Sequence, residues 1–256
     1  MKTLFVKDIR QLWRTFRLPA LLLSGLFFAI LDPIGARYMP QIMEQLLRGA
    51  EGITIIMPEL GPADALISYF GNVAQMGAFI VILTAMGAVA REREQGVSAW
   101  LLTRPVGRLP YLYSKYAAYS VGVLLTMASG TLLAALYTTS LLGVPPLVPT
   151  IWGAVFMFLY LELILIVALS ASALLRSQIA AGGVTLVFLI MLWLPQLFLD
   201  QSDVGKYMPY RLSSQIGSLL KGNIGAADFL PALPAAIILG IVAQAVASLS
   251  FRRAEL

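Results

Sequence analysis

The sequence predicts an all-α polytopic membrane protein with six transmembrane helices, preceded by an amphipathic helix. Three observations lead to this prediction. Hydrophobic residues make up 59% of the 256 residues, charged residues only 12%, and the mean hydropathy is +0.83, whereas soluble domains carry about 25% charged residues. Six apolar runs are long enough to cross roughly 30 Å of hydrocarbon as helices of about 20 residues. Lysine and arginine gather between these runs, where they act as topology signals.

The six expected spans form a single transmembrane domain over residues 1–256. They are Leu18–Tyr38, Ser68–Ala90, Lys115–Leu142, Ile151–Leu175, Ile179–Leu199 and Phe229–Phe251. Their length favours helices, since periodicity does not separate helix from strand in a continuous apolar run. A strand barrel would need alternating polar and apolar residues, which these runs lack. Asp32-Pro33 interrupts the first run, so a kink or a helix end is expected there, with Asp32 capping the segment or pairing with Arg37.

Residues 1–17 have the pattern of a basic amphipathic helix that lies along the membrane surface. Apolar residues recur at helical spacing, and basic residues occupy the remaining faces. The apolar set is Leu4, Phe5, Ile9, Leu12, Trp13 and Phe16, and the basic set is Lys7, Arg10, Arg14 and Arg17. Two interpretations stay open: a membrane anchor with a topology signal, or a helix that also contacts a cytoplasmic partner.

The distribution of basic residues predicts the orientation. With six spans, thirteen lysines and arginines fall on the side of the two termini and five on the other. The positive-inside rule therefore places both termini in the cytoplasm of a multi-pass protein of the cell membrane. Residues 39–67 and 200–228 then lie outside. The first of these segments reads as a small lid or short interfacial helices, and the second holds Ile216, Leu219 and Leu220 at the spacing of a short surface or re-entrant helix.

Residues 91–110 form a charged amphipathic hairpin between the second and third spans. Gly96 can end the helix that leaves the second span, and Pro105 with Pro110 can terminate the element and fix its exit angle. The charged pairs of Arg91–Glu94 are expected to be exposed, each contributing under about 1 kcal/mol. An apolar stripe that could face the membrane surface or a partner comprises Val97, Trp100, Leu101 and Leu102.

Glu162 is the carboxylate placed well inside an expected span. Ionisable residues in a membrane are costly and face the bundle interior or a cavity, so a place in a substrate path is one interpretation. The other is a hydrogen-bonded Glu that holds two helices together, with Ser or Thr as its partner.

Several classes of function are excluded by absent residues. There is no cysteine and no histidine, which excludes disulfides, thiolate zinc sites, Ser-His triads and zinc-protease motifs. No phosphate-binding loop is found, so no cofactor is expected in this chain and no enzymatic activity of its own. The net charge of +5 and the pI near 9.6 do not indicate nucleic-acid binding, because the basic residues are dispersed between apolar runs.

The order of these elements resembles the type-2 ABC permeases, the membrane subunits of ATP-binding-cassette exporters. The similarity rests on an E-x-G-x-x-x-x-L-L-x-x-P-V-x-R loop, on the S-A-L-L-R-S turn at residues 172–177 and on the external segments. The loop residues that match are Glu94, Gly96, Leu101, Leu102, Pro105, Val106 and Arg108. In that family this loop carries a coupling helix, held in a groove of the ATPase subunit. The resemblance implies this interface for Arg91, Glu92, Glu94, Gly96, Trp100, Leu101, Leu102, Pro105 and Arg108.

The resemblance further implies an exporter whose permease subunit works with a separate ABC-type ATPase subunit. A second permease subunit, identical or different, and membrane lipids would be its other partners, and ATP and Mg²⁺ would bind to the ATPase. The alternative interpretation of the hairpin is an interfacial loop whose arginines only set topology. The alternative function is an ATPase-independent secondary transporter or channel. Lipid, peptide, drug and ion all stay open as substrates.

Overall fold

The computed structural model describes residues 2–47, 60–94, 107–199 and 202–253, and only the backbone of Lys2, 44–47, Arg108 and 252–253. Every regular element in these residues is helical, and no strand occurs among them. Six helical segments are long and apolar enough to cross a membrane. The predicted all-α architecture with six membrane-spanning helices is therefore confirmed.

The first half of the chain contributes two spans. Helix α1 (Lys2–Arg14) is followed by the first spanning helix, α2 (Arg17–Leu47). The second span consists of α3 (Pro62–Asn72), a π-helical turn η1 (Val73–Gly77) and α4 (Ala78–Ala85). After a break at residues 86–89, the short helix α5 (Ala90–Glu94) continues it.

The second half contributes four spans. These are α7 (Arg108–Leu141), α8 (Leu147–Leu174), α9 (Gln178–Leu199) and α12 (Ala232–Arg253). Between α9 and α12 lie the short helices η2 (Val204–Tyr207), α10 (Arg211–Ser214), α11 (Ile216–Leu220) and η3 (Ala226–Phe229).

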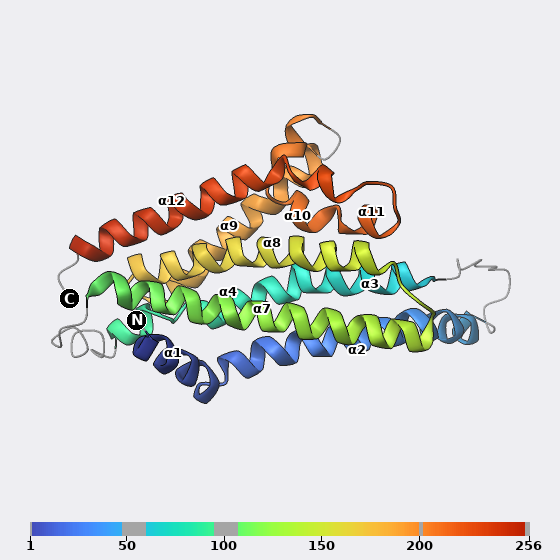
Figure 1. The fold of residues 1–256 in the computed structure, drawn as a ribbon, viewed down its shortest axis with the longest axis horizontal. Coiled ribbons are helices and arrows are strands. Elements are labelled where there is room, and N and C mark those ends of the chain that lie inside the picture. The colour runs from blue at the N-terminus through green and yellow to red at the C-terminus, as the bar shows by residue number, and fades with distance from the viewer. Residues whose placement is uncertain (1, 48–59, 95–106, 200–201, 254–256) are drawn as a thin grey trace.

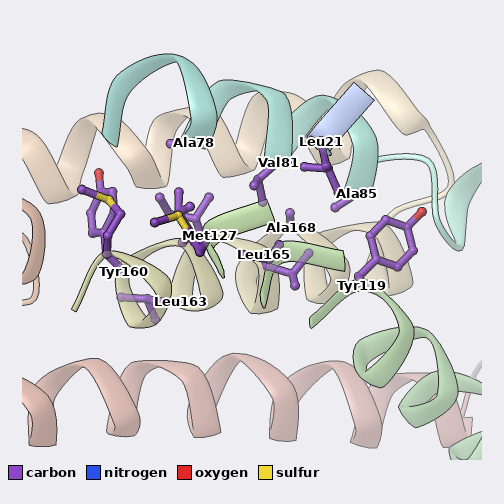
Figure 2. Close-up of a cluster of buried hydrophobic side chains, with 14 of the residues drawn as sticks. Leu21, Ala78, Val81, Ala85, Tyr119, Met127, Tyr160, Leu163, Leu165 and Ala168 are labelled. Carbon is purple, nitrogen blue, oxygen red and sulfur yellow. The ribbon is translucent and has the colours of Figure 1, made fainter. Parts of the chain in front are cut away.

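The spanning helices form one elongated bundle, with α8 packed against α4, α7, α9 and α12 (Figure 1). The start of α1, the start of α7 and the end of α12 lie at the same end of it. The core forms where α2, α4, α7 and α8 meet, and Leu21, Val81, Met127 and Leu165 come together there (Figure 2). By contrast, α9 and α12 are mostly exposed, as expected of surfaces that face lipid or another subunit.

The first spanning helix corrects one expectation. A kink or a helix end was expected at Asp32-Pro33; the helix end is wrong, because α2 passes through both Pro33 and Pro40 and ends at Leu47. Proline is tolerated in membrane helices because neighbouring helices compensate the freed backbone groups. Asp32 consequently lies inside a helix, 9% exposed, and accepts a hydrogen bond from Asn72 Nδ2 of α3 at 2.7 Å.

The two segments expected outside the membrane differ in the helices that they contain. In the first, α2 extends to Leu47 and α3 starts at Pro62, and residues 48–59 lie outside the described residues. In the second, α11 packs against α3 and α8, and its three apolar residues Ile216, Leu219 and Leu220 are buried. Gly222 follows with φ +75, a conformation that favours glycine and reverses the chain.

Candidate functional site: the loop stem

The helical ends on either side of residues 95–106 form what we call the loop stem, namely α5 (Ala90–Glu94) and the first two turns of α7 (Arg108–Lys115). Of the predicted interface residues, Arg91, Glu92 and Glu94 lie on α5, and Arg108 is the first residue of α7. The others, Gly96, Trp100, Leu101, Leu102 and Pro105, lie outside the described residues. Pro110 lies in the first turn of α7, where a missing N–H costs no helical hydrogen bond. It therefore belongs to the start of this helix, and the expectation that it terminates the hairpin is wrong.

Glu92 is buried inside the bundle, with 7% of its surface exposed. Lys115 Nζ donates to its Oε1 at 2.7 Å and Gln11 Nε2 to the same oxygen at 2.9 Å. The hydroxyl of Tyr111 donates to Oε2. The expectation of exposed charged pairs along Arg91–Glu94 is therefore wrong for Glu92. Its side chain points towards α1 and α7, so it cannot contact a partner protein directly.

Asp8 of α1 completes this buried charge cluster. Its Oδ1 lies 3.6 Å from Lys115 Nζ and 3.1 Å from Lys7 Nζ, and Ser114 Oγ donates to its Oδ2 at 2.6 Å. Asp8 and Lys115 are 2% and 3% exposed. Two carboxylates thus face two ammonium groups, and hydrogen bonds from neutral side chains satisfy further oxygens. Such compensation is what makes buried charges tolerable, and removing one member leaves another uncompensated.

The break at residues 86–89 is closed by polar groups from three other helices. Ser172 Oγ of α8 accepts the backbone N–H groups of Val89 and Ala90 at 3.0 and 3.1 Å. From α2, Arg17 donates to the Tyr119 hydroxyl at 2.6 Å and to the Gly87 carbonyl at 3.4 Å. Gly87 is closely surrounded, since a Cβ there would lie 2.6 Å from Gln178 Oε1. These contacts fix where α4 ends and α5 begins.

Arg93 and Glu94 connect α5 to the last three spans. Arg93 donates to the Ala173 carbonyl at 2.9 Å, and its guanidinium lies 5.0 Å from the centre of the Phe251 ring. Glu94 Oε1 accepts the backbone N–H of Gln178 at 3.3 Å, in the first turn of α9. Through these contacts the loop stem meets α1 and the last three spans, and it is itself part of the second and third spans. A displacement of the stem would therefore act on five of the six spans.

Glu162 lies on α8 where α7 packs against it. Ser120 donates a hydrogen bond to its Oε1. Its Oε2 is buried and has no hydrogen-bond partner among the described residues. Ser120 is therefore the partner that the helix-locking interpretation requires. The Oε2 atom of Glu162 takes no part in that contact.

Three residues of the site were not predicted from the sequence, namely Asp8, Gln11 and Ser172. A signal was present for Asp8, because it is the single acidic residue of the otherwise basic segment 1–17. Lys115 gave a similar signal, since a lysine so close to an apolar span needs a partner. Which groups meet could not be read from the sequence, since Asp8, Glu92 and Lys115 belong to three different helices.

The described residues contain no group of three or more acidic, histidine or cysteine side chains that could hold a metal ion. The contacts of the loop stem described above hold helices together. The stem lies on both sides of residues 95–106. This position suits the transmission of movement from that segment to the spans.

Comparisons with known proteins agree with this description. The family model described as "ABC-2 family transporter protein" matches residues 5–206, a range that includes α1, the loop stem and five of the six spans. An uncharacterized transmembrane protein of Bacillus subtilis (strain 168), YxlG, is 29% identical over 137 residues. That match covers 54% of this chain and 53% of the relative, so the aligned part spans about half the length of each.

Proposed function

This chain belongs to the ABC-2 family of transporter proteins, and on that premise we propose that it is the permease subunit of an ABC exporter. A separate ABC-type ATPase subunit would bind ATP and Mg²⁺, since this chain has no phosphate-binding loop. A second permease subunit, identical or different, would complete the pathway. The exposed apolar faces of α9 and α12 are available to that subunit and to lipid.

The observation that supports the proposal best is the buried connection between the loop stem and the spans. Residues 95–106 would lie in the groove of the ATPase, with Trp100, Leu101 and Leu102 as the apolar contacts. Movement of that segment would be passed by Glu92, Arg93 and Glu94 to α1, α7 and the last three spans. Because the central connection, at Glu92, is a compensated buried charge, the spans would tilt as rigid bodies and not yield locally there.

The orientation is part of the proposal. The excess of lysine and arginine at the end that holds α1 and the loop stem supports a cytoplasmic position for this end and for both termini. That is where an ATPase subunit has access to ATP. Export as the direction of transport follows from the type-2 permease resemblance.

The proposal is tested with a Leu101→Asp/Leu102→Asp variant, expressed with the ABC-type ATPase that co-purifies with the native chain. Charged groups in the contact should prevent docking, so transport-linked ATPase activity should fall to the level of the free ATPase while membrane insertion persists. The matched control is Val204→Asp/Tyr207→Asp, which changes two residues that are 55% and 62% exposed at the other end of the bundle. Unchanged coupling in the Leu101/Leu102 variant would refute the proposed role of the loop.

One observation favours the alternative of an ATPase-independent transporter. Asp32 adds a second buried carboxylate within the spans, and like Glu162 it has an oxygen without a partner among the described residues. Ion-driven transporters use such groups. The same preparation decides the question: transport by the purified chain in liposomes without ATP or ATPase would support the alternative.

A further inference from the structure

The outer face of α1 forms a groove of about 470 Å³ that the proposed function does not use. Its walls include Lys7, Arg10, Gln11 and Arg14. Lys7, Arg10 and Arg14 stand three and four residues apart, so they share one face of the helix. The groove is thus lined by three cationic side chains in a row.

The two arginines of the groove lack a counter-charge. Both are exposed, and among the described residues no carboxylate lies within 4.0 Å of either. The third cation, Lys7, reaches the carboxylate of Asp8 at 3.1 Å. An unpaired arginine pair in a groove favours an anionic ligand, above all a phosphate, whose oxygens match the guanidinium donors.

Two large aromatic side chains lie beside these cations. Trp13 is 60% exposed and Phe16 is 76% exposed. Phe16 has φ 59, which is unusual for an aromatic residue, and it stands in the turn between α1 and the first span. Exposed aromatic rings next to basic residues are typical of the zone between lipid headgroups and acyl chains. Trp13 and Phe16 lie next to the start of the first span, where it enters the membrane. This position favours lipid over a soluble protein as the partner of the two rings.

The opposite face of α1 is fixed to the bundle. Leu12 and Asp8 are each 2% exposed, and Asp8 is held by Ser114 and Lys115 of α7. The helix that carries the groove is therefore in place before any ligand arrives, so α1 does not have to fold or dock on binding.

From these observations we infer that the groove binds the phosphate headgroup of an anionic phospholipid in the adjoining leaflet. Arg10 and Arg14 contact the phosphate, and Trp13 with Phe16 lies against the upper part of the acyl chains. The groove is distinct from the loop stem, but two of its residues contact the buried charge cluster of the stem. Gln11 donates to Glu92, and Lys7 pairs with Asp8. If the proposed function holds, headgroup binding then adjusts the charge balance of the stem.

The binding itself is tested on the purified chain without any ATPase, so its failure is separable from failure of the proposed function. The chain has four tryptophans. Replacing Trp100, Trp152 and Trp193 with Phe leaves Trp13 as the reporter. Its quenching by brominated phosphatidylglycerol is compared with that by brominated phosphatidylcholine in mixed bilayers at low salt. We expect the anionic lipid to be preferred by at least five-fold, since each basic residue near an anionic surface contributes about that factor.

Three variants sharpen the test. Arg10→Gln/Arg14→Gln should lose the preference, and Arg10→Lys/Arg14→Lys should keep most of it. Lys206→Gln/Lys221→Gln removes the same charge from the far end and should keep all of it.

Equal quenching by the two lipids, or a preference that survives Arg10→Gln/Arg14→Gln, would overturn the inference. So would loss of the preference in excess inorganic phosphate, which would indicate a free-phosphate site. Shielding of Trp13 by an added ATPase subunit, without lipid preference, would assign the groove to that protein.

Discussion

Glu92 in the loop stem and Glu162 within the spans are both carboxylates in a helical bundle, but their surroundings differ. Glu92 accepts hydrogen bonds from Gln11, Tyr111 and Lys115, which come from two other helices. Glu162 accepts one from Ser120, and its second oxygen has no partner in the described part of the chain. A complete network fixes a geometry, whereas an incomplete one leaves capacity for water, a proton or a ligand. The first suits transmission of movement, and the second suits contact with what is transported.

Among the substitutions that test this comparison, Lys115→Met should have the largest effect on stability. The change leaves Glu92 and Asp8 buried without their central cation, so the free energy of unfolding should fall by about 3–5 kcal/mol. The measurement is denaturant unfolding in mild micelles. Lys206→Met is the matched control, because Lys206 also pairs with a carboxylate at 2.7 Å but both partners are exposed. A Lys115→Met protein as stable as the control would contradict the structural role of the cluster.

Glu92→Gln removes the charge and keeps the shape. The cost should be about 2 kcal/mol, since hydrogen bonds to charged groups contribute about 1.5–3 kcal/mol. The same unfolding assay checks it. Adding Lys115→Met to this variant should cost much less than it does in the native chain, because the two residues belong to one network. Additive effects of the two changes would show that Glu92 and Lys115 do not act together.

Glu162→Gln should have the smallest effect on stability, within about 1 kcal/mol. The amide can still accept from Ser120, and no second partner is lost. The functional effect should be larger than the structural one: transport by the reconstituted complex should change in its pH dependence. A loss of stability as large as that of Glu92→Gln would indicate a helix lock instead. Native transport at every pH would remove Glu162 from the substrate path.

The six spans could be predicted because their length alone identifies them, but their ends could not. The expected end of the first span near Tyr38 lies well short of Leu47, because neighbouring helices accommodate Pro33 and Pro40. For the same reason Asp32, expected at a kink or a helix end in the first span, lies inside a continuous helix. The second span begins at Pro62, not Ser68, since Pro62 suits a first helical turn and Asp64 accepts the Gly61 N–H at 3.0 Å.

The site was predictable only in position. The charge pattern predicted a hairpin at residues 91–110 with exposed charged pairs, and the family resemblance selected Glu92 and Glu94 for the interface. Glu92 differs from Glu94 only in its neighbours, and those are supplied by α1 and α7. Pairings between helices that are far apart in the chain depend on packing, and no local pattern in a single sequence reports them.

The central claim is that residues 95–106 contact an ATPase and pass its movement to the spans through the loop stem. The most direct measurement is site-specific cross-linking of the complex, for which the absence of cysteine is convenient. Leu101→Cys gives a single reactive site in the loop, and Leu132→Cys, 63% exposed in the middle of a span, is the control. The account predicts an adduct between the ATPase subunit and Leu101→Cys alone. Adducts at neither position, or equally at both, would contradict it.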